Sequence, residues 1–348
     1  MQNRSLNPLS TDDCESLQNL LDGIDSDWDV GQSLHYLVHA SAANLPFPGA
    51  GHTLDRWRSL ARVGRYDLSL AKLFEGHTDA LAILHELGSS ELQGVGRVWG
   101  IWCAEPPGKA IKFTKNDEDG VGEIHGTKPW CSGARHVDWA LISAWDDDGN
   151  PCLLAVDLRQ PEVTVTSEGW HAVGMQATVS HDVQFDGAQA RQVGQSGAYV
   201  ARPGFYHGGG GVAACWYGAA AGIVEIVHAT LQGRAEAVHS LAHLGAMDVA
   251  LAQAACLLHA ASQEIDAEPH QSNEYAVSRA RLAVEAAAET ILIRAARAVG
   301  AGPLCKNGRF ARLMADLPVF IRQSHAERDL ASHGLAATRH EGEQLWGL

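Results

Sequence analysis

The feature that most constrains this chain is a change of hydrophobic period along its 348 residues. Apolar residues recur at helical spacing from about residue 10 to residue 87, and short alternating or apolar runs follow from about 95 to 185. From about Gly208 the sequence is Ala-rich and helical again, with long periodic patterns at 219–231, 242–265 and 274–299. Helices therefore flank a segregated β region, which argues against an alternating βαβ chain and predicts an α+β fold.

Within the β region, the strongest local pattern is a hairpin. Residues 139–145 and 151–157 are apolar runs, and the Asp, Gly and Asn residues between them predict a tight turn. A second hairpin is expected to turn at Asp119–Gly120, and residues 163–166 and 183–186 predict further strands. The run Gly208–Gly211 is interpreted as a flexible entry to a helix that packs closely on its neighbours.

Charge and composition exclude several classes of partner. The net charge of −15 argues against nucleic acid, because a phosphate-binding surface needs clustered Lys and Arg. The longest apolar stretch, residues 212–224, is shorter than the roughly 18 residues of a membrane span, and no secretory segment follows Met1. We expect no membrane partner and a cytoplasmic location. Neither a disulfide framework nor a metal site is indicated by the seven Cys and 18 His.

Two segments of the β region carry a family resemblance. Residues 102–108 read Trp-Cys-Ala-Glu-Pro-Pro-Gly, and residues 126–134 read Gly-Thr-Lys-Pro-Trp-Cys-Ser-Gly-Ala. They resemble the paired flavin-site signatures of the acyl-CoA dehydrogenase family. Residues 169–180 are similar to that family's next β-segment, and residues 298–316 align without a gap to its Phe-Gly-Gly to Arg-Asp stretch.

The resemblance spans most of the chain and implies three domains. They are an N-terminal helical domain at residues 1–94, a central antiparallel, β-barrel-like and flavin-contacting domain at 95–200, and a C-terminal bundle of long helices at 201–348. The Ala-rich C-terminal helices suit the family's dimer and tetramer interfaces, so we expect a homo-oligomer. The same small residues could serve packing inside one subunit.

The resemblance also implies an FAD-dependent flavoprotein. Trp130 would pack on the flavin ring system, and Ser132 would hydrogen-bond near the reactive N5, with Cys131 between them. The backbone of Trp102, Cys103 and Ala104 would follow the pyrimidine edge of the ring. The protein would position the cofactor and tune its electronics, while the cofactor carries the redox step.

The part of the family pattern that holds the tail of FAD is altered. Arg297 stands where the family has a Gln, and with Gly300 it is expected to contact the cofactor, often across a subunit boundary in the family. Arg297, Arg309 and Arg312 suit phosphates, although they could equally be helix-end charges that complement carboxylates. Lys109-Ala110 replaces the family's Gly-Ser, which puts recognition of CoA in doubt.

The catalytic carboxylate of the family is missing from both of its usual positions. Eight residues after Asp316 stands Ser324, followed by His325, and the alternative position falls in 208–214, which has no carboxylate. Ser324 and His325 are therefore the predicted catalytic residues. Three interpretations of His325 stay open. It acts as the base, it serves a monooxygenase reaction, or it is an ordinary capping or surface residue.

Three functions follow from these residues. The leading one is an FAD-dependent oxidoreductase that desaturates an acyl thioester or related small acyl substrate, by α-proton abstraction and hydride transfer to flavin. An electron-transfer partner or oxygen would then reoxidise the flavin. The second is a flavin-dependent monooxygenase of the same fold that receives reduced flavin from a reductase. The third is a non-catalytic subunit retained for binding or assembly.

Overall fold

The computed structural model describes residues 11–106, 108, 110–116 and 120–339. Its N-terminal part is helical, and α3 and α4 supply most of the buried surface there. The elements are α1 (Thr11–Asp22), α2 (Val30–His39), α3 (Thr53–Tyr66), α4 (Leu68–Glu86) and the short 3-10 helix η1 (Ser90–Leu92).

The central part forms one seven-stranded sheet. Its strands are β1 (Trp99–Trp102), β2 (Lys112–Lys115), β3 (Val121–Cys131), β4 (Trp139–Asp146), β5 (Pro151–Asp157), β6 (Val163–Val165) and β7 (His181–Gln192), with the 3-10 helix η2 (Gln176–Thr178) before β7. The pairings β4–β2–β3–β7–β5–β4 return to their start, so the sheet closes into a barrel-like ring. β1 lies beside β4, and β6 lies beside β7.

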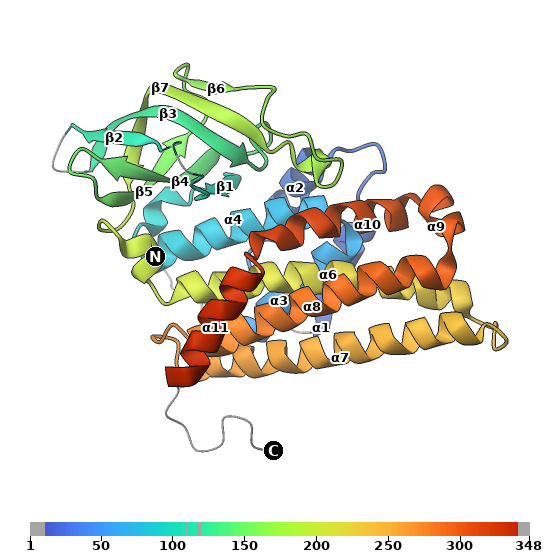
Figure 1. Ribbon diagram of the computed structural model, residues 1–348. Helices are drawn as coiled ribbons and strands as arrows, with labels where there is room; N and C mark the ends of the chain where they lie inside the picture. The colour runs from blue at the N-terminus through green and yellow to red at the C-terminus, as the bar shows by residue number, and fades with distance from the viewer. Residues whose placement is uncertain (1–10, 107, 109, 117–119, 340–348) are drawn as a thin grey trace.

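The C-terminal part is a bundle of long helices. Its elements are α5 (Ala198–Ala201), α6 (Gly204–Leu231), α7 (Val238–Ala267), α8 (Glu274–Val299), α9 (Ala301–Lys306), α10 (Gly308–Phe320), η3 (Ile321–Gln323) and α11 (Glu327–Arg339). α4 contacts β1 on one side and α6 and α10 on the other, so this helix lies between the sheet and the bundle (Figure 1).

Most of the predicted elements are confirmed. The 139–157 hairpin is β4–β5, with Trp139 opposite Asp157 and Trp145 opposite Pro151. The second hairpin is β2–β3, although Asp119 at its turn lies outside the described residues. The sheet is mainly antiparallel as expected, but β4 pairs in parallel with β1 and β2. The β2–β3 hairpin provides the long crossover that a parallel β1–β4 pairing needs.

Two segments need comment. Residues 169–180, likened to a β-segment of the family, form turns and η2 that lead into β7, because Met175 and Val179 adopt left-handed φ angles of 57° and 48°, which a strand does not allow. The run Gly208–Gly211 lies inside α6, not in a loop. A Cβ on Gly210 would collide with the indole of Trp57 in α3, so close packing outweighs the low helix propensity of glycine there.

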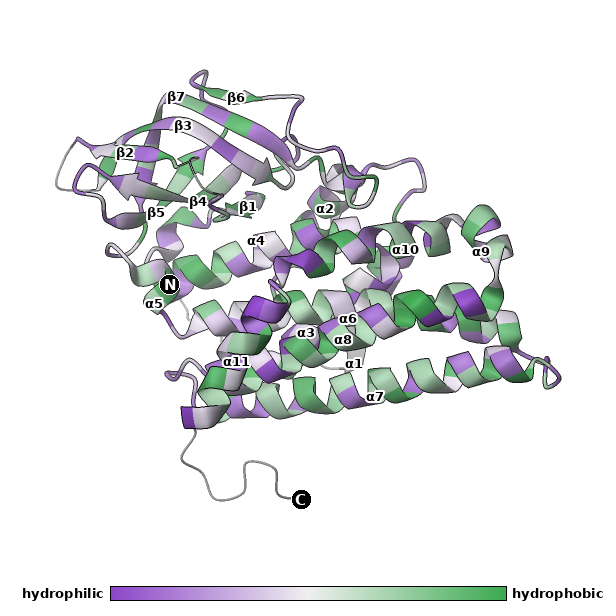
Figure 2. Cartoon of the chain, in the orientation of Figure 1, coloured by the Kyte–Doolittle hydropathy of each residue, from purple (hydrophilic) through white to green (hydrophobic). Residues whose placement is uncertain are grey.

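The outer helix α7 is apolar but poorly covered. By length and composition alone, α6 and α7 could each cross a membrane, which the sequence did not predict. In α6, 72% of the most apolar window is buried within the fold, as expected of a core helix, whereas in α7 only 17% is buried. α7 packs on α8 with one face, and Figure 2 shows hydrophobic colour along much of its length. Large exposed apolar surfaces of this kind mark interaction sites.

Candidate functional site

The two signature segments meet at the end of β1 and just after β3. The indole Nε1 of Trp102 donates to the carbonyl oxygen of Ser132 over 2.9 Å. The buried Lys128 ammonium lies 3.7 Å from the Glu105 carboxylate and donates to both oxygens of Ser143 in β4. The fold therefore brings together the segments that the sequence pairs.

Three further residues of these segments have distinct settings. Cys131 is buried, Cys103 is half-buried and Ala104 is exposed. Burial raises the pKa of the Cys103 thiol to about 11 and raises that of Cys131 as well. Both thiols are therefore neutral near pH 7 and do not act as thiolate nucleophiles.

Trp130 presents an uncovered aromatic surface beside Ser132. Its side chain is large, yet the residue is 49% exposed and has a left-handed φ of 57°. Such a conformation is a genuine outlier for a bulky residue and persists only where the surroundings enforce it. The backbone thus turns the indole outward instead of into the core.

A chain of hydroxyl groups runs from Ser132 into the protein. The Oγ atoms of Ser132 and Ser180 lie 2.9 Å apart, and those of Ser180 and Thr178 lie 2.8 Å apart. The Thr178 hydroxyl donates to the carbonyl of Met175 over 2.7 Å. Ser180 and Thr178 are buried, whereas Ser132 is only half-buried and can be reached from outside.

Met175 connects this chain of hydroxyl groups to the two helical domains. Its backbone N–H donates to Oδ1 of Asp316 in α10 over 2.5 Å. The other oxygen of Asp316 accepts from the Ser69 hydroxyl at the start of α4, over 3.3 Å. Burial raises the pKa of Asp316, and the Met175 hydrogen bond opposes that shift. The β-domain, α4 and α10 therefore meet at one point.

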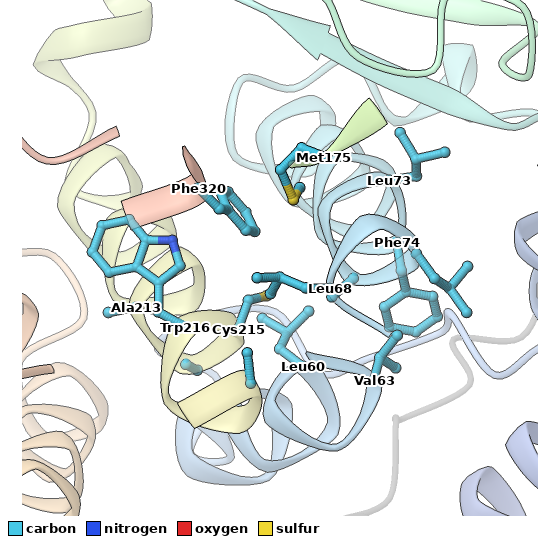
Figure 3. Close-up of a cluster of buried hydrophobic side chains, with 14 of the residues drawn as sticks. Leu60, Val63, Leu68, Leu73, Phe74, Met175, Ala213, Cys215, Trp216 and Phe320 are labelled. Carbon is cyan, nitrogen blue, oxygen red and sulfur yellow. The ribbon is translucent and has the colours of Figure 1, made fainter. Parts of the chain in front are cut away.

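Charged side chains are buried next to this junction. In α4 the ammonium of Lys72 lies 3.1 Å from the Glu75 carboxylate, and both side chains are largely buried. Burial raises the pKa of Glu75, and Lys72 opposes this shift. The Lys72 ammonium also lies 5.8 Å from the ring centre of Phe320, which meets Trp216 of α6 edge to face. Figure 3 shows Phe320, Trp216 and Met175 in this cluster.

The indole N–H groups of Trp57 and Trp216 and the Asp79 carboxylate have no hydrogen-bond partner among the described residues. The indole Nε1 of Trp216 is fully buried without one. The Asp79 carboxylate, on the same helix as Glu75, is 9% exposed, and no hydrogen bond to it occurs within the described part of the chain. Buried polar groups normally find partners, so such groups are candidates to meet a ligand.

The two predicted catalytic residues lie in the turn before α11 and differ in burial. Ser324 is buried, and its hydroxyl donates to Oε2 of Glu285 over 2.5 Å. The other oxygen of Glu285 accepts from Arg322. His325 is instead accessible: its side chain is 58% exposed and lies 3.5 Å from Asp329 of α11, whose other oxygen lies 3.3 Å from the Ser324 hydroxyl. Its role as a base stays a prediction.

The predicted contacts to the cofactor tail lie at another end of the bundle. Arg297 and Gly300 are exposed at the C-terminal end of α8, next to α9 (Figure 1). Arg309 donates to the carbonyl of Arg65, and Arg312 lies 3.8 Å from Asp67. The roles of Arg297 and Gly300 stay predictions.

Comparison with known proteins places the fold. The chain resembles KijD3, solved in complex with FMN and dTDP-3-amino-2,3,6-trideoxy-4-keto-3-methyl-D-glucose, with a TM-score of 0.80, 20% identity and coverage of 99% of this chain and 97% of that one. A nitrososynthase from Micromonospora carbonacea var. africana gives a TM-score of 0.78 at 18% identity, covering 98% and 99%. TdsC from Paenibacillus sp. A11-2, solved with FMN and indole, gives a TM-score of 0.72 at 16% identity, with coverage of 94% of this chain and 98% of that one.

Residues 195–321 match the family described as acyl-CoA dehydrogenase, C-terminal domain. The chain has the acyl-CoA dehydrogenase fold. No curated protein matches its sequence significantly.

Within this acyl-CoA dehydrogenase fold, the residues at the junction suit a flavin. A flat ring system needs an aromatic surface and hydrogen-bonding groups at its edges. Trp130 offers the surface, and the Ser132 hydroxyl is reachable beside it. Both observations come from the structure, and each fits the cofactor that the sequence segments predict.

Sequence reasoning missed several residues of the junction. Neither the contact of Thr178 with Ser180 nor the partners of Asp316 were foreseen. Lys72 and Glu75 carried a visible signal, because they are charged residues within a helix most of whose residues are buried. Charged groups inside such a helix are candidates for a functional site.

Proposed function

We propose that this protein is a flavin-dependent monooxygenase that receives reduced flavin from a partner reductase and acts on a small molecule. The observation that carries the proposal concerns the position of the missing base. Ser324 occupies it, and the nearest carboxylate, Glu285, is engaged by both Ser324 and Arg322. Asp329, 3.3 Å from the Ser324 hydroxyl, accepts from the His325 backbone N–H. Among the described residues, therefore, no carboxylate beside Ser324 is free to remove an α-proton, while the flavin segments are in contact.

FMN is the flavin that we propose, in place of the FAD expected from sequence. The altered residues are those that would hold the pyrophosphate and adenine of FAD, whereas the ring-binding segments keep the family pattern. Two of the similar structures, KijD3 and TdsC, were solved with FMN. Both points favour a cofactor that ends at a single phosphate.

When bound, the reduced flavin would supply two electrons to oxygen, so that one oxygen atom enters the substrate and the other leaves as water. The residues of this chain would bind and orient the reactants. Trp130 would cover one face of the ring, and Ser132 would bond its N5 edge. Glu75, with its raised pKa, and Asp79, which accepts no hydrogen bond from the described residues, would receive or hold a substrate proton.

The buried charges favour a polar substrate over a long fatty acyl chain. Lys72, Glu75 and Asp79 all lie on α4, next to the Trp216 cluster. An alkyl chain placed against these groups would desolvate them without offering hydrogen bonds, which costs free energy. The small molecules bound in the similar structures, an amino-keto sugar nucleotide and indole, carry hydrogen-bonding groups.

We further propose that the protein assembles through α7 and α8. An open groove of about 660 Å³ lies between these helices, lined mainly by small and apolar residues that include Ala252, Cys256, Leu257 and Ala286. Helices from a second copy would cover this groove and the exposed face of α7. Small residues allow the close helix approach that such an interface needs.

Oxygen consumption tests the proposed activity. With photoreduced FMN and a panel of amino sugars, keto sugars and indoles, we expect at least one compound to divert the consumed oxygen from hydrogen peroxide into a product. Consumption that ends wholly as peroxide with every compound would contradict the proposal.

Desaturation of an acyl thioester is the second candidate, because residues 195–321 match the acyl-CoA dehydrogenase C-terminal domain. Anaerobic bleaching of bound flavin by an acyl-CoA would favour this candidate over the monooxygenase.

A further inference from the structure

We infer that the buried hydroxyl chain makes Ser132 a hydrogen-bond acceptor toward the cofactor, so that the protein binds reduced flavin more tightly than oxidised flavin. The inference rests on the proposed function, because it takes the Ser132 hydroxyl to face flavin N5. The inference assigns the protein's preference for reduced over oxidised flavin to two specific residues, Thr178 and Ser180.

The direction of each hydrogen bond follows from counting protons. A hydroxyl group has one proton to donate and can accept further bonds. The Thr178 proton goes to the Met175 carbonyl, an oxygen that can only accept. The contact of 2.8 Å between Thr178 and Ser180 therefore uses the Ser180 proton. The contact of 2.9 Å between Ser180 and Ser132 must then use the Ser132 proton.

Ser132 thus has no proton left for the ligand and offers only lone pairs. Thr178 and Ser180 are 1% and 2% exposed, so water cannot supply a replacement donor inside the chain. Reversing the chain would remove the Thr178 proton from the Met175 carbonyl. That oxygen would keep only its bond from the Thr178 backbone N–H, at 3.1 Å. Reversal therefore costs one hydrogen bond.

The two redox states of a flavin differ at N5. Oxidised flavin has a lone pair and no proton at N5, whereas two-electron-reduced flavin carries an N5–H that donates. Ser132 can accept the N5–H of reduced flavin with the hydrogen bonds of the hydroxyl chain in their present direction. It can donate to N5 of oxidised flavin only after all of these hydrogen bonds have reversed direction. One net hydrogen bond separates the two complexes, which corresponds to roughly threefold to tenfold in affinity. A tenfold preference would raise the two-electron midpoint potential of bound flavin by about 30 mV.

Affinities of the full-length protein for oxidised FMN and for anaerobically reduced FMN measure this preference directly. We expect the wild type to bind reduced FMN more tightly. Thr178→Val removes the donor that fixes the direction of the chain, so the ratio of the two affinities should fall toward one. Ser180→Ala should do the same by a different route, since it frees the Ser132 proton.

Two matched variants separate this role from simple damage. Thr178→Ser keeps the hydroxyl and should restore the wild-type ratio. Thr230→Val makes the same chemical change in α6, where the threonine hydroxyl donates to the Ile226 carbonyl, and should leave the ratio unchanged. An unchanged ratio in both Thr178→Val and Ser180→Ala would overturn the inference and leave the proposed function standing. Wild-type protein that binds neither form of FMN would overturn both.

Discussion

The backbone N–H of Met175 donates to the Asp316 carboxylate over 2.5 Å, and this contact joins the β-domain to helix α10 across 141 positions of sequence. The second Asp316 oxygen accepts from Ser69 of α4. One carboxylate therefore holds together three parts of the chain at the point where the flavin segments and the buried charges meet.

Replacing this carboxylate should destabilise the junction. Asp316→Ala would leave the buried donors of Met175 and Ser69 without an acceptor, which we expect to lower the free energy of unfolding by about 2 to 3 kcal/mol. Asp316→Asn keeps one carbonyl oxygen and should lose less. Urea unfolding measures the loss of stability in both variants. Equal losses for Asp316→Ala and Asp316→Asn would contradict the stabilising role of the hydrogen bond that the Asn oxygen retains.

The crossing of α3 and α6 depends on glycine. A Cβ on Gly218 would collide with the backbone carbonyl of Ala61, and a Cβ on Gly64 would collide with that of Cys215. Gly218→Ala should lower the free energy of unfolding by about 1 to 3 kcal/mol, because backbone atoms cannot rotate aside as a side chain can. Thermal and urea unfolding measure the loss.

Gly334 provides the matched control for this change. It lies within α11, and its Cβ would meet no atom within 4 Å among those that the structure describes. Gly334→Ala should be neutral or stabilise by up to about 1 kcal/mol through helix propensity. A Gly218→Ala protein as stable as Gly334→Ala would contradict the close crossing.

The sequence predicts those elements that local pattern determines. Helix α8 was expected at residues 274–299 and is observed there, because its apolar period is unbroken and Gly300, with a φ of 69°, ends it. The β4–β5 hairpin follows from two apolar runs around an Asp- and Gly-rich turn. The fold class could be predicted because such signals occur in the right order along the chain.

What the sequence could not provide are contacts between distant residues. Ser132 and Ser180 are 48 positions apart, and their contact depends on how β3 and β7 align. The glycine run was misplaced because its helix is favoured by packing against Trp57, not by propensity. His325 and Ser324 are adjacent in sequence, yet one is exposed and the other buried, and no local pattern distinguishes them.

His77 should make stability depend on pH. The backbone N–H of Trp99 donates to its Nδ1 over 3.1 Å, and burial lowers its pKa to about 4 from 6.5. Between these two values the unfolded chain binds a proton at this residue and the folded chain does not. The contribution of neutral His77 to the free energy of unfolding is fully present above pH 6.5. It is lost as the pH falls toward 4, by up to about 3 kcal/mol.

His77→Asn tests this dependence, because an amide oxygen can accept from Trp99 without titrating. We expect the free energy of unfolding to fall less steeply between about pH 6.5 and pH 4 than in the wild type. Urea titrations at a series of pH values measure the slope. Identical slopes for the two proteins would assign the pH dependence to other groups.

A charge in the α7–α8 groove should disrupt the proposed assembly. Ala286 is exposed and lines the groove, so Ala286→Glu would place a carboxylate in an apolar contact between subunits. Light scattering after size exclusion should then show a mass shifted toward the monomer. Ala331→Glu makes the same change on an exposed position of α11 and should leave the mass unaltered. A monomeric wild type would contradict the proposed assembly.

Binding of FMN tests the central claim most directly, and two tryptophans sharpen the test. Trp130 is 49% exposed beside Ser132, whereas Trp28 is 37% exposed and packs on Tyr36 in the N-terminal helices. We would titrate the wild type, Trp130→Ala and Trp28→Ala with reduced and oxidised FMN and record flavin fluorescence. The account predicts saturable binding to the wild type, a roughly tenfold loss for Trp130→Ala and no loss for Trp28→Ala. No binding to the wild type, or equal losses for both variants, would contradict a flavin site at Trp130.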